Sequence, residues 1–273
     1  MLEDLEPLTP VHFFALGAEC HHYSGRKELP LPKKHLLSDL SDLTGDQTFA
    51  EVSLGWSKKG ITATIRVSRS TIEPFFPDFT AGDSVEFFID TRDVKTSGSN
   101  TRFCHHFYFL PLPVQTNGES IQAGEVTRFR TDDSHELCDS SLLYVACERE
   151  RKKNVSVQRV SRLKGSSCCD SSGSLRRVNS QSAIDEEQNY GDGAAGRDKG
   201  TGKPSERLQK YTLQLFIPAV ALHGYDPSQF DRLGFTYRIN RYDDTPQHFS
   251  ASSEDFSIEQ YPSTWASLKL IKE

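Results

Sequence analysis

Hydrophobic and polar residues alternate with a period of two along much of the chain. In ITATIRV, residues 61–67, apolar side chains take every second position and Thr, Thr and Arg stand between them. This period is typical of a β-strand that buries one face. The segments 211–217 and 233–241 alternate in the same way. Runs of β-favouring residues predict further strands at 49–56, 84–90, 102–110, 125–130, 142–147 and 267–271.

Helical periodicity is nearly absent. Only residues 218–224 predict a short helix, because Pro218 suits a first turn and Gly224 a helix end. Many strands with one apolar face are buried most simply when two sheets pack face to face. We therefore predict an all-β fold, an antiparallel, jelly-roll-like β-sandwich of two sheets over residues 45–273. Residues 1–44 are predicted to be an N-terminal extension that packs on this domain.

The composition changes abruptly between residues 148 and 207. Lys, Arg, Ser and Gly dominate this segment, and Tyr190 is its only aromatic residue. It holds 13 basic and 9 acidic residues, so its net charge is about +4. Because the whole chain carries −6, the rest carries about −10. A segment of this composition can bury little apolar surface, so we predict one long disordered insertion in the sandwich domain.

The acidic body limits the partners that we expect. Nucleic acids and anionic membrane surfaces require a concentrated basic surface, so neither is expected. No apolar run approaches the roughly 20 residues of a membrane-spanning helix, and the acidic start MLEDLEPLTP is unlike a secretory signal. We therefore expect a cytoplasmic chain. Its six cysteines include no C-x-x-C pair and are expected to be free thiols.

Carboxylates are concentrated in GDSVEFFIDTRD, residues 82–93. Alternation puts Glu86 and Asp90 together on the face opposite Val85, Phe87 and Ile89. Four residues of strand separate the two carboxylates by roughly 13 Å, more than the roughly 5 to 9.5 Å found in glycoside hydrolases. They are therefore not the acid and base of one hydrolytic centre, and we predict that both face outward.

Asp90 and Asp93 stand at a strand end, and Asp83 stands at the other end of the same strand. Carboxylates and carbonyls at such ends can hold a structural calcium ion, although the regular spacing of a calcium loop is missing. Aspartates at strand ends also commonly accept hydrogen bonds from their own backbone in turns. Both interpretations stay open, and no other cofactor is expected.

The adjacent His105 and His106 suggest a metal or haem site. Neighbours on a strand point to opposite faces, so the two imidazoles cannot chelate one ion together. We predict a buried, hydrogen-bonded His105 and a surface His106. The catalytic patterns G-x-S-x-G and H-E-x-x-H, Gly-rich phosphate loops and dinucleotide fingerprints are absent from the sequence. We therefore do not expect an enzyme.

Three segments, in order, resemble the motifs of the family 9 carbohydrate-binding modules and their relatives. GDSVEFFIDTRD resembles D-S-V-E-x-F-I-D, and LGFTYRINR resembles G-F-x-x-x-x-N-D. The closing YPSTWASLKLI resembles D-P-S-x-F/W-G-x-L-x-L. The resemblance spans about residues 45–273 without the insertion. It implies a β-sandwich that binds sugars without catalysis, is often attached to a glycoside hydrolase and often carries structural calcium.

The resemblance also implies a sugar site. Glu86 falls on the family's sugar-binding glutamate, Asn240 on its strand asparagine, and His106 and Tyr108 fall near polar positions of the partner strand. The sequence departs from the family's motifs in two ways. Arg241 stands where the family has an aspartate, and the two tryptophans that stack on sugar in some members are missing here. Phe79 and Phe256 stand in those regions and could substitute, while Trp56 and Trp265 are expected in the core.

The strand periodicity adds Asp90 and Arg238 to this polar face. Charged and hydrogen-bonding groups beside aromatic rings suit a polyol, although an ordinary solvated sheet face has the same pattern. The predicted ligand-binding residues are Glu86, Asp90, His106, Tyr108, Arg238, Asn240, Phe79 and Phe256.

Two functions follow from these residues. The first is a non-catalytic domain that binds a carbohydrate or a small polar ligand. The alternative is an intracellular protein-interaction or scaffold domain that kept the fold and lost the sugar site, since the tryptophan pair is missing. A haem-binding relative of the DOMON type commonly holds its haem with a Met and His pair. Met1 is the chain's only methionine, so we do not expect haem binding.

Overall fold

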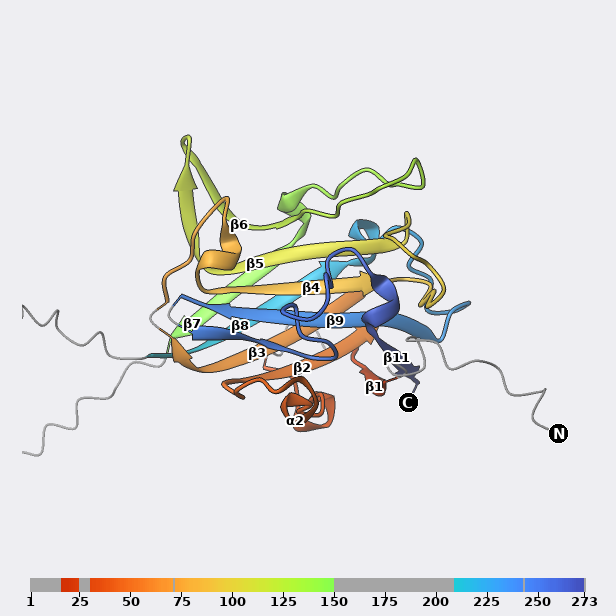
Figure 1. Ribbon diagram of the computed structural model, residues 1–273, viewed down its shortest axis with the longest axis horizontal. Helices are drawn as coiled ribbons and strands as arrows, with labels where there is room; N and C mark the ends of the chain where they lie inside the picture. The colour runs from red at the N-terminus through yellow and green to blue at the C-terminus, as the bar shows by residue number, and fades with distance from the viewer. Residues whose placement is uncertain (1–15, 25–29, 71, 150–208, 243, 273) are drawn as a thin grey trace, which may run out of the picture. The chain divides into compact units, whose positions relative to one another are not determined.

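Eleven strands form a single sheet in the described part of the chain, which comprises residues 16–24, 30–70, 72–149, 209–242 and 244–272 of the computed structural model (Figure 1). The strands are β1 (Gly17–His22), β2 (Ala50–Ser57), β3 (Gly60–Ser70), β4 (Ser84–Asp90), β5 (Cys104–Thr116), β6 (Glu119–Glu125), β7 (Tyr144–Arg149), β8 (Gln209–Pro218), β9 (Arg232–Arg241), β10 (Asp244–His248) and β11 (Ala266–Ile271).

Helical structure in the same residues is limited to short pieces. These are the four-residue helix α2 (Ser41–Thr44) and the 3₁₀ turns η1 (Lys33–His35), η2 (Phe79–Ala81), η3 (Ser140–Leu142), η4 (Ala219–Ala221) and η5 (Pro262–Thr264). The predicted all-β class is confirmed. The helix predicted at 218–224 is only the turn η4, followed by Gly224 with a φ of +74°.

The strand order is β6-β5-β4-β9-β11-β1-β2-β3-β8-β7, with β10 paired to β9. The prediction of two separate antiparallel sheets is wrong, because β1 pairs in parallel with both β11 and β2. It thereby joins one half of the sheet, from β6 to β11 in this order, to the other half, from β2 to β7, and makes one mixed sheet. β1 comes from the segment 1–44 that was predicted to pack on the domain. β6 and β7 stand at the two ends of this order and contact each other, so the sheet nearly closes into a barrel.

The apolar faces of both halves enclose one continuous core. Its fully buried members include Phe87 and Ile89 of β4, Ile65 of β3 and Leu213 of β8. Trp56 belongs to this core at 4% exposure. The alternation of the sequence therefore predicted the inward faces of these strands.

A smaller apolar cluster lies on the opposite face of β4. Phe88 and Cys104 there pack with Ala251, Ile258 and Trp265. The Trp265 indole donates a hydrogen bond to the Ile258 carbonyl at 2.8 Å. The segment 249–265 therefore covers a sheet face that the sequence predicted to be exposed.

Two further differences concern single elements. The strand predicted at 125–130 lies earlier, at Glu119–Glu125, because Asn117 and Gly118, both with positive φ, make a tight two-residue hairpin turn. Glu148 and Arg149 of the predicted insertion complete β7, and the remainder of 148–207 lies outside the described residues.

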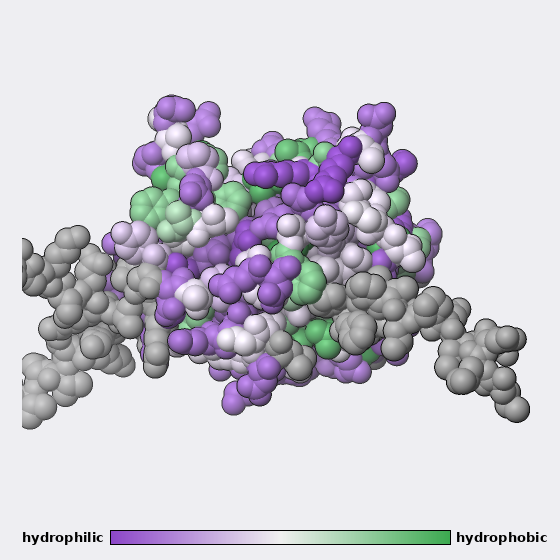
Figure 2. All heavy atoms as spheres, viewed as in Figure 1, coloured by the Kyte–Doolittle hydropathy of each residue, from purple (hydrophilic) through white to green (hydrophobic). Residues whose placement is uncertain are grey.

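The surface seen in Figure 2 is largely hydrophilic, with hydrophobic side chains in small groups. Large exposed apolar side chains such as Val220 and Tyr144 are distributed over several elements. Among the described residues there is no helix with the length and apolar character needed to cross a membrane.

Candidate functional site

Glu86 stands at the middle of β4, between β5 and β9. The sheet register places Tyr108 beside it on one neighbouring strand and Arg238 on the other. The Arg238 guanidinium donates from Nε to Glu86 Oε1 at 2.7 Å and from Nη2 to Oε2 at 2.9 Å. This bidentate geometry is the strong form of a carboxylate–guanidinium pair.

Two more side chains complete the group. Asn240 Nδ2 donates to Glu86 Oε1 at 2.7 Å and to Ser84 Oγ at 2.9 Å. His106 Nε2 lies 2.7 Å from Glu86 Oε2. We call Glu86, His106, Arg238 and Asn240 the Glu86 cluster. Glu86 is 0% exposed, and the other three are 5–7% exposed.

The charges of this cluster stabilise each other. Burial by itself raises the pKa of the Glu86 carboxyl, but hydrogen bonds from His106 and Arg238 and the guanidinium charge outweigh it and lower the pKa to about 2. Burial likewise opposes the charge of Arg238, and the Glu86 carboxylate outweighs it and raises the pKa of Arg238. Glu86 is therefore an ionised acceptor at neutral pH.

Aromatic rings flank the cluster. Phe79 of η2 stacks on Tyr108, with 4.8 Å between ring centroids and 8° between planes. Phe88 stacks on His106 at 4.2 Å. His106 was predicted to lie at the surface. That prediction is wrong, because these rings and Glu86 leave it 7% exposed.

Glu259 marks the solvent side of the cluster. Its carboxylate accepts a hydrogen bond from Arg238 Nη1 at 2.5 Å, and its side chain is 29% exposed. The ion pair of Arg238 with Glu86 is therefore buried, whereas the pair with Glu259 reaches solvent.

Asp90 and Asp93 lie at the far end of β4 and form a turn. Asp90 Oδ1 accepts from the Arg92 backbone N–H at 2.9 Å, and Oδ2 accepts from that of Val94 at 2.7 Å. Asp93 pairs with Lys95 at 2.7 Å and accepts from Ser267 Oγ at 2.6 Å. Donors and an ammonium group already face these carboxylates, so they do not fit a calcium ion. Burial raises the pKa of Asp90.

The structure thus groups part of the predicted ligand-binding set. Glu86, His106, Arg238 and Asn240 meet directly, with Tyr108 and Phe79 stacked at their side. Asp90 belongs to the turn, and Phe256 lies on the covering segment 249–265 with 38% exposure. Glu86 and Asp90 do lie opposite the main core, but they do not face solvent as predicted. Glu86 is enclosed by its cluster, which the segment 249–265 covers through Glu259, and Asp90 is enclosed by its own turn.

Other residues of the site were missed. Glu259 comes from an irregular segment, where no period assigns a side chain to a face. Gly124 of β6 lies where a Cβ atom would be 2.7 Å from the Tyr108 hydroxyl oxygen, so it leaves room for that ring. One group of His, Cys, Asp and Glu side chains in the described residues is arranged to hold a metal ion, namely His105, Glu125 and His135.

Comparisons with known proteins concern the fold. No protein-family model and no curated protein matches the chain. Among solved structures it is similar to a family 9 carbohydrate-binding module from Caldicellulosiruptor kristjanssonii. The complex of that module with cellotriose gives a TM-score of 0.48 at 11% identity and 94% coverage of both chains. The complex with glucose gives 0.49 at 11% identity, covering 94% of this chain and 96% of the other.

A protein of Bacteroides uniformis, described as carbohydrate-binding, is also similar, with a TM-score of 0.38 at 10% identity over 81% of this chain and 78% of that one. The module from Caldicellulosiruptor kristjanssonii belongs to the family whose motifs the sequence resembles.

Proposed function

We propose that the chain is a non-catalytic binding domain that takes a carbohydrate, or a small polar ligand of similar chemistry, at the Glu86 cluster. One observation carries this proposal: a group of charged side chains that hydrogen-bond to one another lies beside the stacked rings of Phe79 and Tyr108. A sugar presents hydroxyl groups and an apolar C–H face, and these two kinds of protein group match them.

The ionisation of Glu86 favours binding over acid catalysis. A general acid holds its proton near neutral pH and therefore needs a raised pKa, whereas the pKa of Glu86 is lowered to about 2. Asn240 orients the buried Glu86 carboxylate, which holds the Arg238 guanidinium in place, and Arg238 can donate to ligand hydroxyl groups from its Nη1. Because these side chains hold each other in place, little conformational entropy is lost when a ligand binds.

Access to the cluster is on the side of Glu259. Arg238 forms one ion pair with Glu86, which is buried, and one with Glu259, which reaches solvent. A ligand hydroxyl can therefore replace the Glu259 carboxylate on Arg238 Nη1. Phe79, which is partly exposed, forms the neighbouring ring surface. We therefore expect ligand contacts at Arg238 and Phe79 before any at the fully buried Glu86.

Isothermal titration of the full chain against mono- and oligosaccharides tests the proposal. We expect saturable binding that Phe79→Ala weakens about tenfold, because a lost ring contact corresponds to about 1.4 kcal/mol. Phe75→Ala is the matched control: Phe75 is on the same loop, 40% exposed, and packs against Tyr242 instead, with the two rings tilted by 38°. No heat with any sugar, or equal losses in both variants, would contradict a sugar site at this position.

A second function is favoured by the saturation of Glu86. Both of its carboxylate oxygens already accept hydrogen bonds from protein donors, as expected for a domain that kept the fold and binds protein partners instead. For that function we expect flat sugar titrations with a folded chain, and a reproducible partner in pull-downs from native extract. Deletion of residues 152–205, which spares β7, tests whether the insertion contributes to that contact.

A further inference from the structure

A second polar cluster lies on the face of β5 opposite the Glu86 cluster. His105 comes from β5, Glu125 ends β6, and His135 belongs to the following irregular segment. One nitrogen or oxygen atom from each of the three side chains lies within 4.8 Å of the others. His105 and Glu125 have no exposed side-chain surface, and the His135 side chain is 4% exposed.

Both imidazoles point at one oxygen. His105 Nδ1 and His135 Nε2 each lie 2.8 Å from Glu125 Oε1. The carboxylate is held from two more sides: Thr127 Oγ1 donates to Oε1 at 2.7 Å, and the Cys138 backbone N–H donates to Oε2 at 2.8 Å. The three groups are therefore fixed in place before any ligand arrives.

The surroundings of His135 define its protonation. Its Nδ1 lies 2.7 Å from the Arg102 carbonyl oxygen, which can only accept, so Nδ1 carries a proton. Its Nε2 faces a second acceptor, the Glu125 carboxylate. A metal ion bound at Nε2 would satisfy this second acceptor. When a histidine binds a metal through one ring nitrogen, its other ring nitrogen usually donates a hydrogen bond to an acceptor such as a backbone carbonyl.

His105 adds an independent observation. It is 0% exposed, and its Nε2 has no hydrogen bond of normal geometry among the described residues, although the His223 backbone lies beside it. Its ring stacks on Phe107 with 6° between planes.

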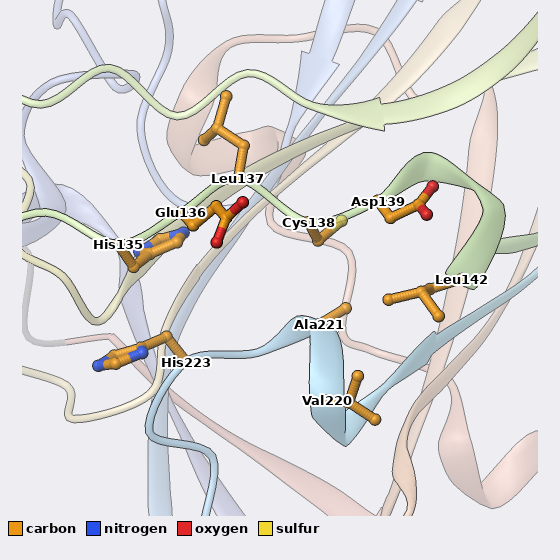
Figure 3. Close-up of a pocket in the computed structure, with 9 residues that line it drawn as sticks. All are labelled: His135, Glu136, Leu137, Cys138, Asp139, Leu142, Val220, Ala221 and His223. Atoms are coloured by element: carbon orange, nitrogen blue, oxygen red, sulfur yellow. The ribbon is translucent and has the colours of Figure 1, made fainter.

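A pocket of about 580 Å³ leads to this cluster. His135 belongs to both, and Cys138, Val220 and His223 contribute to the opposite walls. Figure 3 shows the rings of His135 and His223 side by side at one end, and their planes are 4° apart with centroids at 5.7 Å. The pocket therefore provides a path from solvent to the His135 side of the cluster.

We propose that His105, Glu125 and His135 form a binding site for a divalent transition-metal ion of the zinc class, entered through this pocket. Two imidazoles and one carboxylate suit zinc, whereas calcium prefers an all-oxygen shell. Tetrahedral zinc with bonds near 2.0 to 2.1 Å keeps its ligand atoms about 3.3 Å apart. The two nitrogen–oxygen distances of 2.8 Å therefore need to lengthen by only about half an ångström, and a fourth position stays open.

Titration of the metal-stripped full chain with Zn²⁺, followed by calorimetry and by elemental analysis after dialysis, tests the site. We expect one tightly held ion per chain, which His135→Gln weakens at least about 100-fold, since even losing an outer hydrogen bond to a ligand costs 10- to 100-fold. Glu125→Gln is the second variant. His21→Gln, which removes a histidine from the pair with Glu19 on β1, is the control for surface binding.

Cobalt substitution reports the ligand set directly. We expect the visible bands of four-coordinate Co²⁺ without the thiolate charge-transfer band that Cys138 would give. Thermal unfolding of each variant without metal verifies that it is folded. A folded wild-type chain that binds no Zn²⁺, an affinity unchanged in both folded cluster variants, or a thiolate band would each overturn the assignment.

Discussion

Three buried carboxylates of the sheet show how local partners set chemistry at the scale of a residue. Glu86 and Glu125 are both buried, yet hydrogen bonds from histidine, joined for Glu86 by Arg238, outweigh burial and bring each pKa to about 2. Asp90 is equally buried but accepts mainly from neutral backbone N–H groups, so burial dominates and its pKa is raised. Donor charge, more than depth, separates the three.

Replacing Glu86 tests the buried ion pair. Glu86→Gln keeps the shape of the side chain but leaves the Arg238 charge without its buried partner, so we expect the free energy of unfolding to fall by about 3 kcal/mol. Glu259→Gln removes the exposed carboxylate from the same guanidinium and should cost less than about 1 kcal/mol. Urea unfolding at neutral pH measures both. Equal losses would mean that burial does not distinguish the two pairs.

The lowered pKa of Glu86 also predicts acid sensitivity. The pKa falls from 4.5 to about 2 on folding, so the carboxylate contributes its full stability above about pH 4.5 and loses it as the pH falls toward 2. The full contribution is about 3 kcal/mol, of which about 2 is lost between pH 6 and pH 3. The stability difference between wild type and Glu86→Gln should shrink accordingly. A difference independent of pH would contradict the ion pair.

Sequence reasoning found the site residues that a strand period controls. Glu86, His106, Arg238 and Asn240 share a face because each stands at a fixed position on β4, β5 or β9. Their burial was not predictable, because the cover is the irregular segment 249–265. The partners of His105 escaped for the same reason, since His135 comes from a loop whose position no periodicity encodes.

At the scale of elements, regular alternation was a reliable guide and short polar strands were not. The predicted strand at 84–90 matches β4 at both ends, and β3, β8 and β9 extend their predictions by a few residues. β10 was missed because its sequence, DTPQH, has no apolar period. β1 was missed because GAECHH alternates weakly and gains its place from its parallel neighbours, β11 and β2.

The turn between β2 and β3 depends on one glycine. Gly60 has a φ of +139°, and a Cβ atom there would lie 2.1 Å from the Ile217 carbonyl oxygen. We expect Gly60→Ala to lower the free energy of unfolding by at least about 1 to 3 kcal/mol, the usual magnitude of local backbone strain. Gly98→Ala is the control, because nothing lies within 4 Å of a Cβ atom there. Similar urea midpoints for the two variants would refute this account of the turn.

At the scale of the whole described domain, the two halves of the sheet meet both through β1 and through side chains. Gln247 of β10 is 2% exposed. Its Oε1 accepts from the backbone N–H groups of Phe49 and Ala50 at 2.9 Å, and its Nε2 donates to the Ala50 carbonyl at 3.0 Å. β10 pairs with β9, which β11 and β1 separate from β2 in the sheet order. Gln247 therefore bridges strands that are not neighbours in the sheet.

Removing this bridge should weaken the closure of the sheet. Gln247→Leu keeps similar volume but leaves two buried N–H groups without their acceptor, so we expect a loss of about 2 to 6 kcal/mol at about 1 to 3 kcal/mol for each group. Gln115→Leu, at an exposed position of β5, should change stability by less than about 0.5 kcal/mol. Amide hydrogen exchange should accelerate at the start of β2 in the first variant alone. Unchanged protection there would show that β1 by itself holds the halves together.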